Sequence, residues 1–328
     1  MLKLNLTKPI NIFLQSRYLR YYSSSSKELH TQVNDDPIYF LRESTKDIFI
    51  IGTSHISKNS ALSVQKLIQD VKPDTVVLEL CQNRFEKMKT EENSKNLEIH
   101  NPRSSVQSLM EDIINMFRTQ QLTSGNLLQS LLKRFYNQFR LLGIIPGLEF
   151  KLAIREAEKL NANIVLGDLP ISQTMNGLMK NLTELVPLLK NPSNMTMNRD
   201  LIRLEEMMKP LSHVLSRDPL DTDDLEKEFK ILLTNKNLRE MRSIIKKTVP
   251  GIYDSFLFNR ECHIARSIKS SNGNRIVVVV GAMHCEGLKE LLEKDLTSIP
   301  VISKSDINPN LPIQFNMDLF SKFKNLFK

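Results

Sequence analysis

Apolar positions along the chain follow two different periods, and the alternation between them predicts an α/β fold. Short runs rich in Val and Ile, bounded by turn-forming residues, are typical of strands. Between them, apolar residues recur every three or four positions, which predicts helices. Strand, helix and strand with short joints form a βαβ unit, so we expect a central, largely parallel or mixed sheet flanked by helices. The predicted strands cover residues 38–41, 47–52, 75–80, 163–166, 275–280 and 300–302.

Residues 171–250 carry helical spacing throughout, with prolines at or near the predicted helix ends. We expect this region to be a helical insertion or cap on an α/β domain that spans residues 35–305. Further helices are predicted on both sides of it, and the first two strands should pair through a turn at 43–46. The predicted helices cover 61–71, 104–142, 150–160, 171–189, 197–215, 223–234, 238–248, 253–270 and 286–292.

The formal net charge of +8 is concentrated near the N-terminus. Residues 1–27 contain no Asp or Glu, and residues 1–22 carry four of the cations, so that +4 remains for the rest. A basic, Ser-rich, acid-poor segment with an amphipathic pattern is typical of a mitochondrial transit peptide. We therefore predict that residues 1–22 direct the chain to the mitochondrion.

Several function classes lack the features they need. No basic stripe with interleaved aromatic residues appears and Trp is absent, so no nucleic-acid partner is expected. The phosphate-loop, dinucleotide-binding, serine-hydrolase and HExxH motifs are also absent. Three cysteines without CxxC spacing indicate reduced, partly buried thiols.

Membrane contact is predicted only at the C-terminal tail. No apolar run approaches the roughly 18 residues that span a bilayer. The tail, residues 306–328, ends in an amphipathic helical pattern with apolar residues on one face and lysines elsewhere. Two interpretations stay open: the helix lies on an anionic membrane surface, or it packs on the core.

Four predicted strands end in a polar or ionisable residue, namely His55, Glu79, Asp168 and His284. Parallel strands bring their carboxyl ends to one edge, where ligands of open α/β sheets bind. Both histidines follow a strand in the pattern Gly-x-x-His, and the glycine allows a sharp turn off the sheet. We therefore expect these side chains to converge in one polar site.

Two imidazoles with one or two carboxylates form a donor set for zinc or another divalent metal ion. Such an ion brings the pKa of a bound water toward about 7 and makes hydroxide available for attack. The competing interpretation is structural. The histidines would then hold hydrogen bonds within their turns, while Glu79 and Asp168 would cap the following helices.

Two further residues belong to the candidate site. Arg260 lies on the apolar face of its predicted helix, which turns a cation toward the interior. Because a buried charge is costly without a partner, we expect Glu79, Asp168 or a bound anion beside it. Glu149 lies close after a Pro-Gly turn, at the margin of another apolar helix face.

Short motifs follow one another in order from about residue 47 to 292. They are Gly52-Thr-Ser-His55 with Ser57, Pro73-Asp74 leading to Glu79-Leu-Cys-x-x-Arg84, Pro146-Gly147-Leu-Glu149-Phe150, Leu166-Gly167-Asp168-x-Pro170, Asn259-Arg260 and Val280-Gly281-Ala-Met-His284. As an ordered set they resemble the TraB/PrgY family. The resemblance implies a fold shared with the TIKI proteases and, more distantly, with erythromycin esterases and haem-binding ChaN-like proteins.

In that superfamily paired Gly-x-x-His motifs and acidic residues build the site, and the TIKI proteins are metal-dependent peptidases. PrgY is associated with shutting down a peptide pheromone, and eukaryotic TraB-domain proteins with mitochondria. Carried over to this chain, the resemblance implies roles for His55, Glu79, Arg260 and His284, followed by Glu149. One departure is Leu169, where the family pattern leads us to expect Arg.

The first hypothesis is a metal-dependent hydrolase acting on peptides. His55, Glu79 and His284 would bind zinc, manganese or cobalt, with Glu149 or a second carboxylate as general base and Arg260 binding an oxyanion or orienting a carboxylate. The second hypothesis is a non-catalytic mitochondrial adaptor or regulatory protein at a membrane, with the helical region and the tail as partner surfaces. An adaptor does not require all these polar groups to face one site.

Overall fold

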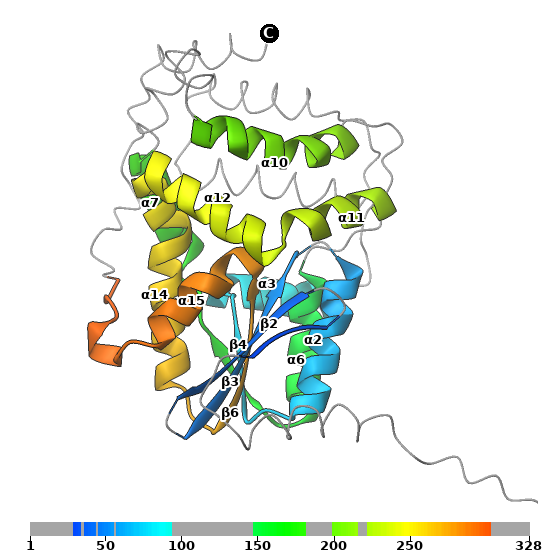
Figure 1. Ribbon diagram of the computed structural model, residues 1–328. Helices are drawn as coiled ribbons and strands as arrows, with labels where there is room; N and C mark the ends of the chain where they lie inside the picture. Colours follow the sequence, from blue (N-terminus) through cyan, green and yellow to red (C-terminus); the bar gives the residue numbers. More distant parts are fainter. Residues whose placement is uncertain are drawn as a thin grey trace, which may run out of the picture.

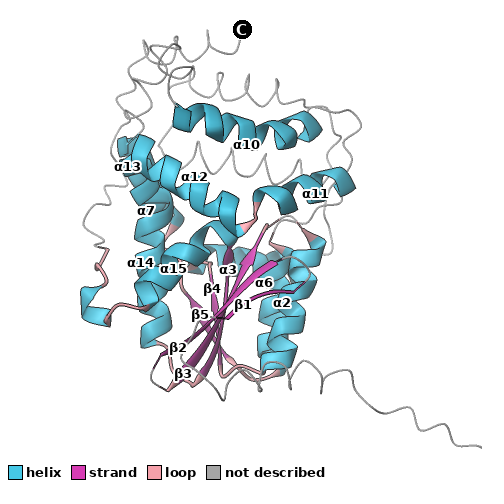
Figure 2. Ribbon diagram, viewed as in Figure 1, coloured by secondary structure: helices cyan, strands magenta, loops and turns pink. Residues whose placement is uncertain are grey.

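A computed structural model of the chain describes residues 29–33, 36–43, 45–55, 57–93, 147–181, 199–215 and 222–302. Its centre is a six-stranded mixed sheet with helices on both faces (Figures 1 and 2), as the alternating pattern predicts. The strands are β1 (Leu29–Val33), β2 (Asp36–Glu43), β3 (Lys46–Thr53), β4 (Thr75–Leu78), β5 (Asn163–Leu166) and β6 (Arg275–Gly281).

The sheet has the order β1-β2-β3-β6-β4-β5. The first three strands are antiparallel neighbours, whereas β3, β6, β4 and β5 run parallel. The predicted pairing of the first two apolar runs is confirmed, because β2 pairs with β3 around residues 43–46. In the parallel half, Thr53 stands opposite Gly281, so two central strands end side by side.

Successive side chains of the central strands are buried alternately in two hydrophobic cores, one on each face of the sheet. On one face, Ile276 and Val278 of β6 pack with α14 (Asn259–Ser270) and α15 (Cys285–Leu292). On the other face, Val277 and Val279 pack with α2 (Lys58–Val71) and α6 (Leu148–Lys159). Both faces of β6 are therefore covered, which explains why its sequence is an unbroken apolar run rather than an alternating one.

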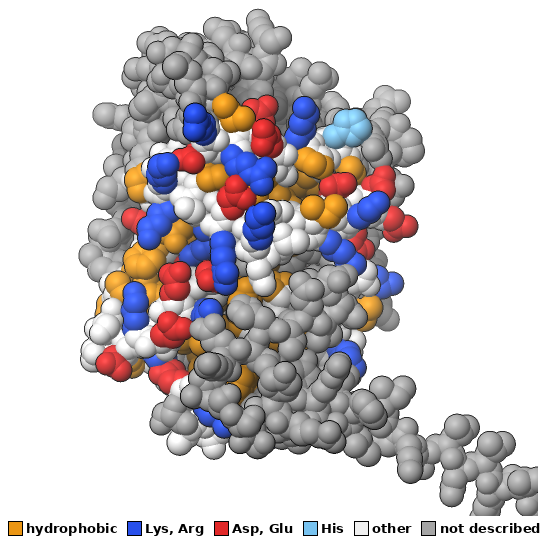
Figure 3. Space-filling model, viewed as in Figure 1, with side chains coloured by type: hydrophobic (Ala, Val, Ile, Leu, Met, Phe, Trp, Pro, Cys, Tyr) orange, Lys and Arg blue, Asp and Glu red, His pale blue; other side chains and the backbone are white. Residues whose placement is uncertain are grey.

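A layer of helices covers the carboxyl edge of the sheet (Figure 1). It contains α10 (Arg199–Leu215), α11 (Thr222–Leu232) and α12 (Asn235–Thr248), which share a small core into which Met283, just beyond β6, also packs. We call these three helices the cap. The described parts of 171–250 are thus helical, as predicted, and they include α7 (Ile171–Asn181). Figure 3 shows acidic and basic side chains interspersed on the visible face of the molecule.

The helix predicted over 253–270 contains a π turn. The helix runs without a break from α13 (Pro250–Tyr253) through the π turn η2 (Asp254–Phe258) into α14. Two elements were not predicted from the sequence, namely β1 and α3 (Gln82–Asn93), because they contain few apolar residues.

The prediction of a strand at 300–302 is wrong. Arg266 donates from Nη1 to the carbonyls of Leu296 and Ile299, and Ile299 and Ile302 pack on the core without strand partners. The three cysteines are free, as expected, but fully rather than partly buried. Residues 1–22, 104–142 and 306–328 lie outside the described residues, so the targeting and tail predictions stay predictions. Within the part of the chain that is described, no helix has the length and apolar character to cross a bilayer.

Candidate functional site

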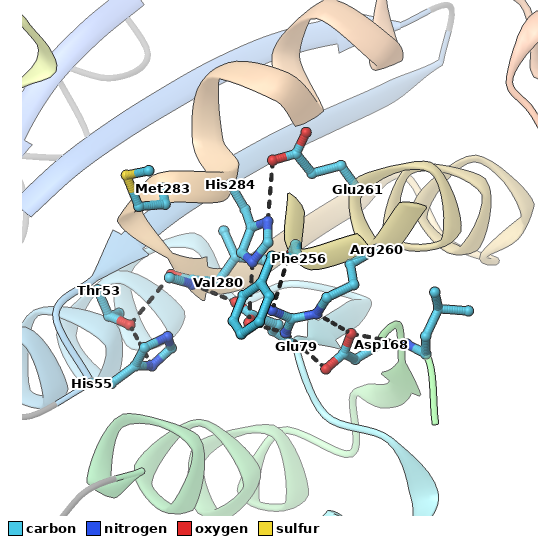
Figure 4. Close-up of polar contacts among 12 residues, drawn as sticks. Thr53, His55, Glu79, Asp168, Phe256, Arg260, Glu261, Val280, Met283 and His284 are labelled. Atoms are coloured by element: carbon cyan, nitrogen blue, oxygen red, sulfur yellow. Dashed lines mark hydrogen bonds and ion pairs between the residues drawn. The ribbon is translucent and has the colours of Figure 1, made fainter. Parts of the chain in front are cut away.

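The polar residues that follow four strands all lie at the carboxyl edge of the sheet (Figure 4). His55 follows β3, Glu79 follows β4, Asp168 follows β5 and His284 follows β6 by way of the short helix η3 (Ala282–His284). These strands are parallel neighbours, so the convergence comes from the sheet and not from the loops. The cap lies beyond this edge (Figure 1).

Glu79 is the centre of the cluster and is almost fully buried. One carboxylate oxygen pairs with Arg260 Nη2 and lies 3.4 Å from His284 Nε2, while the other accepts the Gly281 N–H at 2.6 Å. Burial acts to raise the pKa of this carboxyl. The charges of His284 and Arg260 outweigh that effect and hold the pKa well below its usual range.

Arg260 joins Glu79 to Asp168. Its Nε and Nη2 atoms donate to the two Asp168 oxygens at 2.9 Å each, a bidentate arrangement. The expectation that a carboxylate would lie beside Arg260 is therefore confirmed, and both proposed partners are present. A second cation, Arg84, lies 3.7 Å from Asp168 and donates to the Glu79 carbonyl at 3.4 Å. Asp168 also accepts the backbone N–H of Leu169 at 2.9 Å.

His284 is buried and held from behind. Its Nδ1 atom lies 3.1 Å from Glu261 Oε1, while Nε2 faces Glu79. Glu261 in turn binds Arg242 of the cap helix α12 at 2.5 and 3.1 Å. Burial lowers the pKa of His284, but the charge of Glu79 and the hydrogen bonds to both carboxylates outweigh it and raise the pKa to about 9.

His55 is held by a different carboxylate, Glu149, at the start of α6. The His55 Nδ1 atom lies 2.7 Å from Glu149 Oε1, and the imidazole ring stacks at a tilt on Phe150. The backbone of His55 is left-handed, with φ 56°, and its carbonyl accepts the Gly147 N–H at 3.2 Å. Partial burial lowers the pKa of His55, but the hydrogen bond to Glu149 outweighs it and the pKa is raised.

The two glycines of the Gly-x-x-His motifs lie where a side chain would not fit. A methyl group at Gly281 would stand 2.5 Å from His55 Nε2 and 3.4 Å from a Glu79 oxygen. A methyl group at Gly52 would stand 2.6 Å from Cys285 Sγ and 2.9 Å from the Ala282 backbone. Gly281 therefore makes room for the histidine of the other motif, and Gly52 makes room for the turn that follows β6. Burial raises the pKa of the Cys285 thiol, which keeps this thiol protonated.

The donor atoms suit a divalent metal ion, although the described residues do not form a ready metal cage. Each histidine is held at Nδ1 by a buried carboxylate, the usual arrangement behind metal-binding imidazoles. The described part of the chain nevertheless contains no group of three or more His, Cys, Asp or Glu side chains at metal-binding spacing. Glu79 would have to exchange contacts with Arg260 or His284 for contacts with the ion, and Arg260 would keep Asp168.

Three residues of this site were not singled out from the sequence. Arg84 carries the resemblance but was given no role, while Glu261 and Arg242 were missed. Glu261 directly follows Arg260 on α14, and an acidic residue beside the cation already assigned to the site was the available signal. Arg242 lies in a helix of mostly polar residues, where nothing separates it from its exposed neighbours.

The fold and the site define an α/β protein with a histidine–carboxylate cluster at the carboxyl edge of a parallel half-sheet, beneath a helical cap. A sequence model of the TraB/PrgY/gumN family matches residues 40–296. The chain belongs to this family.

Similar proteins from other organisms, among them proteins named for the TraB domain, are consistent with the family assignment. An uncharacterized protein of Methanocaldococcus jannaschii is 29% identical over 259 residues, which are 76% of this chain and 54% of the relative. The human TraB domain-containing protein is 35% identical over 128 residues, 39% of this chain and 32% of the relative, and the mouse protein is equally similar. The chain thus spans about half of the archaeal relative and about a third of the mammalian ones.

Proposed function

We propose that this chain is a metal-dependent hydrolase that acts on peptides. One observation carries the proposal: two histidines at the ends of adjacent parallel strands each have Nδ1 at hydrogen-bond distance from a separate buried carboxylate. His284 Nε2 lies 3.4 Å from Glu79, and His55 Nε2 faces Gly281, whose N–H donates to Glu79. A purely structural histidine needs no such pairing. Peptides as the substrate class follow from the resemblance to the TIKI proteases.

His55, Glu79 and His284 would hold the ion, which when bound polarises a carbonyl group and lowers the pKa of water. With the ion bound, Glu149 and Glu261 would accept the Nδ1 protons, so that each Nε2 atom would be free to face the ion. Glu149 orients His55 in this arrangement, and acting as general base would require it to leave that contact.

Arg260 would bind the developing oxyanion. Its Nε and Nη2 atoms are engaged by carboxylates, whereas Nη1 makes a 3.4 Å contact with the Phe256 carbonyl. Nη1 is therefore the donor that can turn to a substrate oxygen, and preorganised donors of this kind stabilise charge in the transition state. Figure 4 shows Phe256 beside this part of the cluster.

The test compares His55→Ala and His284→Ala with the wild type in three measurements on the same samples: metal content, turnover of a peptide library and melting temperature. Each substitution removes one ion-binding nitrogen, so we expect metal to be lost and turnover to fall at least about 100-fold. His213→Ala, at an exposed position of α10, is the matched control and should keep wild-type metal and turnover.

Two outcomes would contradict the proposal. Turnover in both variants at the wild-type rate would leave the histidines with a structural role. A wild type that retains no metal and cleaves no peptide would favour the alternative, a non-catalytic adaptor.

A further inference from the structure

A buried ion pair links the cap to the candidate site. Arg242 projects from α12 and is buried, and it donates to both oxygens of Glu261, to the Met283 carbonyl at 2.6 Å and to the Tyr253 hydroxyl at 2.8 Å. Met283 immediately precedes His284, so this guanidinium touches both the backbone of the histidine's turn and the carboxylate behind its ring.

The Glu261 carboxylate is tightly surrounded. Its side chain is fully buried, and even a methyl group at Gly287 of α15 would overlap it and Arg242. The hydrogen bonds of Glu261 come from Arg242 and His284, which share Oε1. Without the guanidinium, this carboxylate would lose the two bonds that fix its rotation.

We propose that Arg242 is a positioning residue for His284: it fixes Glu261 so that His284 donates Nδ1–H to Glu261 and turns Nε2 toward Glu79. The inference rests on the proposed function for its consequence, because a metal-binding imidazole must present Nε2 without a proton. The cap then takes part in the site, since one of its side chains sets the orientation of a ligand.

A merely structural role for the same ion pair leads to a different expectation. Arg242 would then fasten α12 to α14, and its loss would loosen the cap while His284 kept its orientation through the short η3 turn. The two roles differ in the state of the His284 Nδ1–H, which depends on Glu261 and not on metal or substrate.

The experiment measures that proton in the metal-free full chain. Long-range proton–nitrogen NMR spectra of the ¹⁵N-histidine-labelled protein, with His284→Asn for assignment, identify the Nδ1–H signal and its rate of exchange with water. We expect a protected Nδ1–H in the wild type, and exchange at least about tenfold faster in Arg242→Met, which keeps the apolar stem but loses every donor. Arg242→Lys keeps the charge without the bidentate fork and should lie between the two.

Arg203→Met is the matched control, since it removes an ion pair between α10 and α12 that is 43% exposed on the Arg203 side. Exchange should remain at the wild-type rate in this variant. An unchanged exchange rate in folded Arg242→Met would overturn the proposal, and if that variant fails to fold, an unchanged rate in Arg242→Lys would do so.

Zinc affinity, measured by chelator competition, is the second readout. We expect about 10- to 100-fold weaker binding in Arg242→Met, the usual effect of losing a group that orients a ligand. A wild type that binds no zinc refutes the proposed function alone, because the exchange measurement still decides whether Arg242 positions His284.

Discussion

The two histidines sit in matching motifs but in contrasting surroundings. The His55 side chain is 35% exposed and has one carboxylate behind it, Glu149, at the beginning of a helix where a negative charge is favourable. The His284 side chain is 4% exposed and is backed by Glu261, which the cap holds through Arg242. The sheet brings both rings to the same edge, and the surrounding helices bury one of them and leave the other partly exposed.

This contrast indicates how the site works. The His284 ring cannot turn without losing contacts with two buried carboxylates, whereas the His55 ring would lose one. We therefore expect His284 and Glu79 to form the less mobile half of the proposed site, and His55 the half nearer to solvent. Three predictions test the contrast, from the largest expected effect to the smallest.

The first prediction concerns the two supporting carboxylates. Glu261→Gln leaves the buried Arg242 facing an amide, so we expect a loss of about 3–5 kcal/mol in the free energy of unfolding, as for other broken buried ion pairs. In Glu149→Gln the amide oxygen can still accept from His55, and the loss should be about 1 kcal/mol. Urea denaturation measures the loss in the free energy of unfolding for each variant. Equal losses would show that Glu261 and Glu149 do not support their histidines in the different ways described.

The second prediction concerns pH. In the folded protein the pKa of His284 is raised to about 9, above the value of 6.5 in the unfolded chain. The protonated ring therefore contributes fully to the stability of the fold below pH 6.5, and this contribution disappears as the pH rises through 9. The metal-free chain should therefore lose about 3 kcal/mol of stability between pH 6.5 and 9. Below about pH 4.5 stability should fall as the pH is lowered, because the pKa values of Glu79 and Glu261 are lower in the folded protein than in the unfolded chain. His284→Gln should flatten the alkaline slope, while His55→Gln should keep most of it, in denaturation curves across this range.

The third prediction concerns the two glycines. Gly52→Ala places a methyl group against the Ala282 backbone and the buried Cys285, so we expect about 1–3 kcal/mol of destabilisation from overpacking. Gly281→Ala meets the His55 ring, which can swing toward solvent at a cost of about 1 kcal/mol. Zinc affinity should nevertheless fall more in Gly281→Ala than in Gly52→Ala. The reverse order in chelator competition would contradict the assignment of His55 as the adjustable ligand.

The inner strands β3, β4 and β6 could be predicted from the sequence because they are buried on both faces. An apolar, β-branched run such as residues 275–280 is best explained as a strand in the core. Glycine, proline or aspartate beside such runs marks where the strands begin or end. The helix α3 gave no such signal, because it carries mostly charged residues, and β1 lies beside a segment interpreted as targeting sequence. Residues 300–302 show the opposite error, since a short apolar run need not form a strand, and Val301 is 72% exposed.

The site was predictable where its residues follow strands and unpredictable where they come from helices. Sheet topology brings His55, Glu79 and His284 together, so their strand-end positions were enough. Arg242 reaches the site only because the cap folds over this edge, a long-range packing event without a local pattern. Asp168, for which capping of the next helix was the alternative, belongs to the cluster through its contacts with Arg260.

The π turn at Asp254–Phe258 makes the length of this segment as important as its composition. Arg260 and Glu261 are adjacent on α14, yet one points to Glu79 and Asp168 while the other points to His284 and Arg242. Each residue of an α-helix advances by about 100° around the axis, so deleting one residue from the π turn would rotate both side chains by that angle. The segment between the cap and α14 should therefore tolerate substitutions far better than insertions or deletions, and its residue count should vary less than that of the loops among homologous chains.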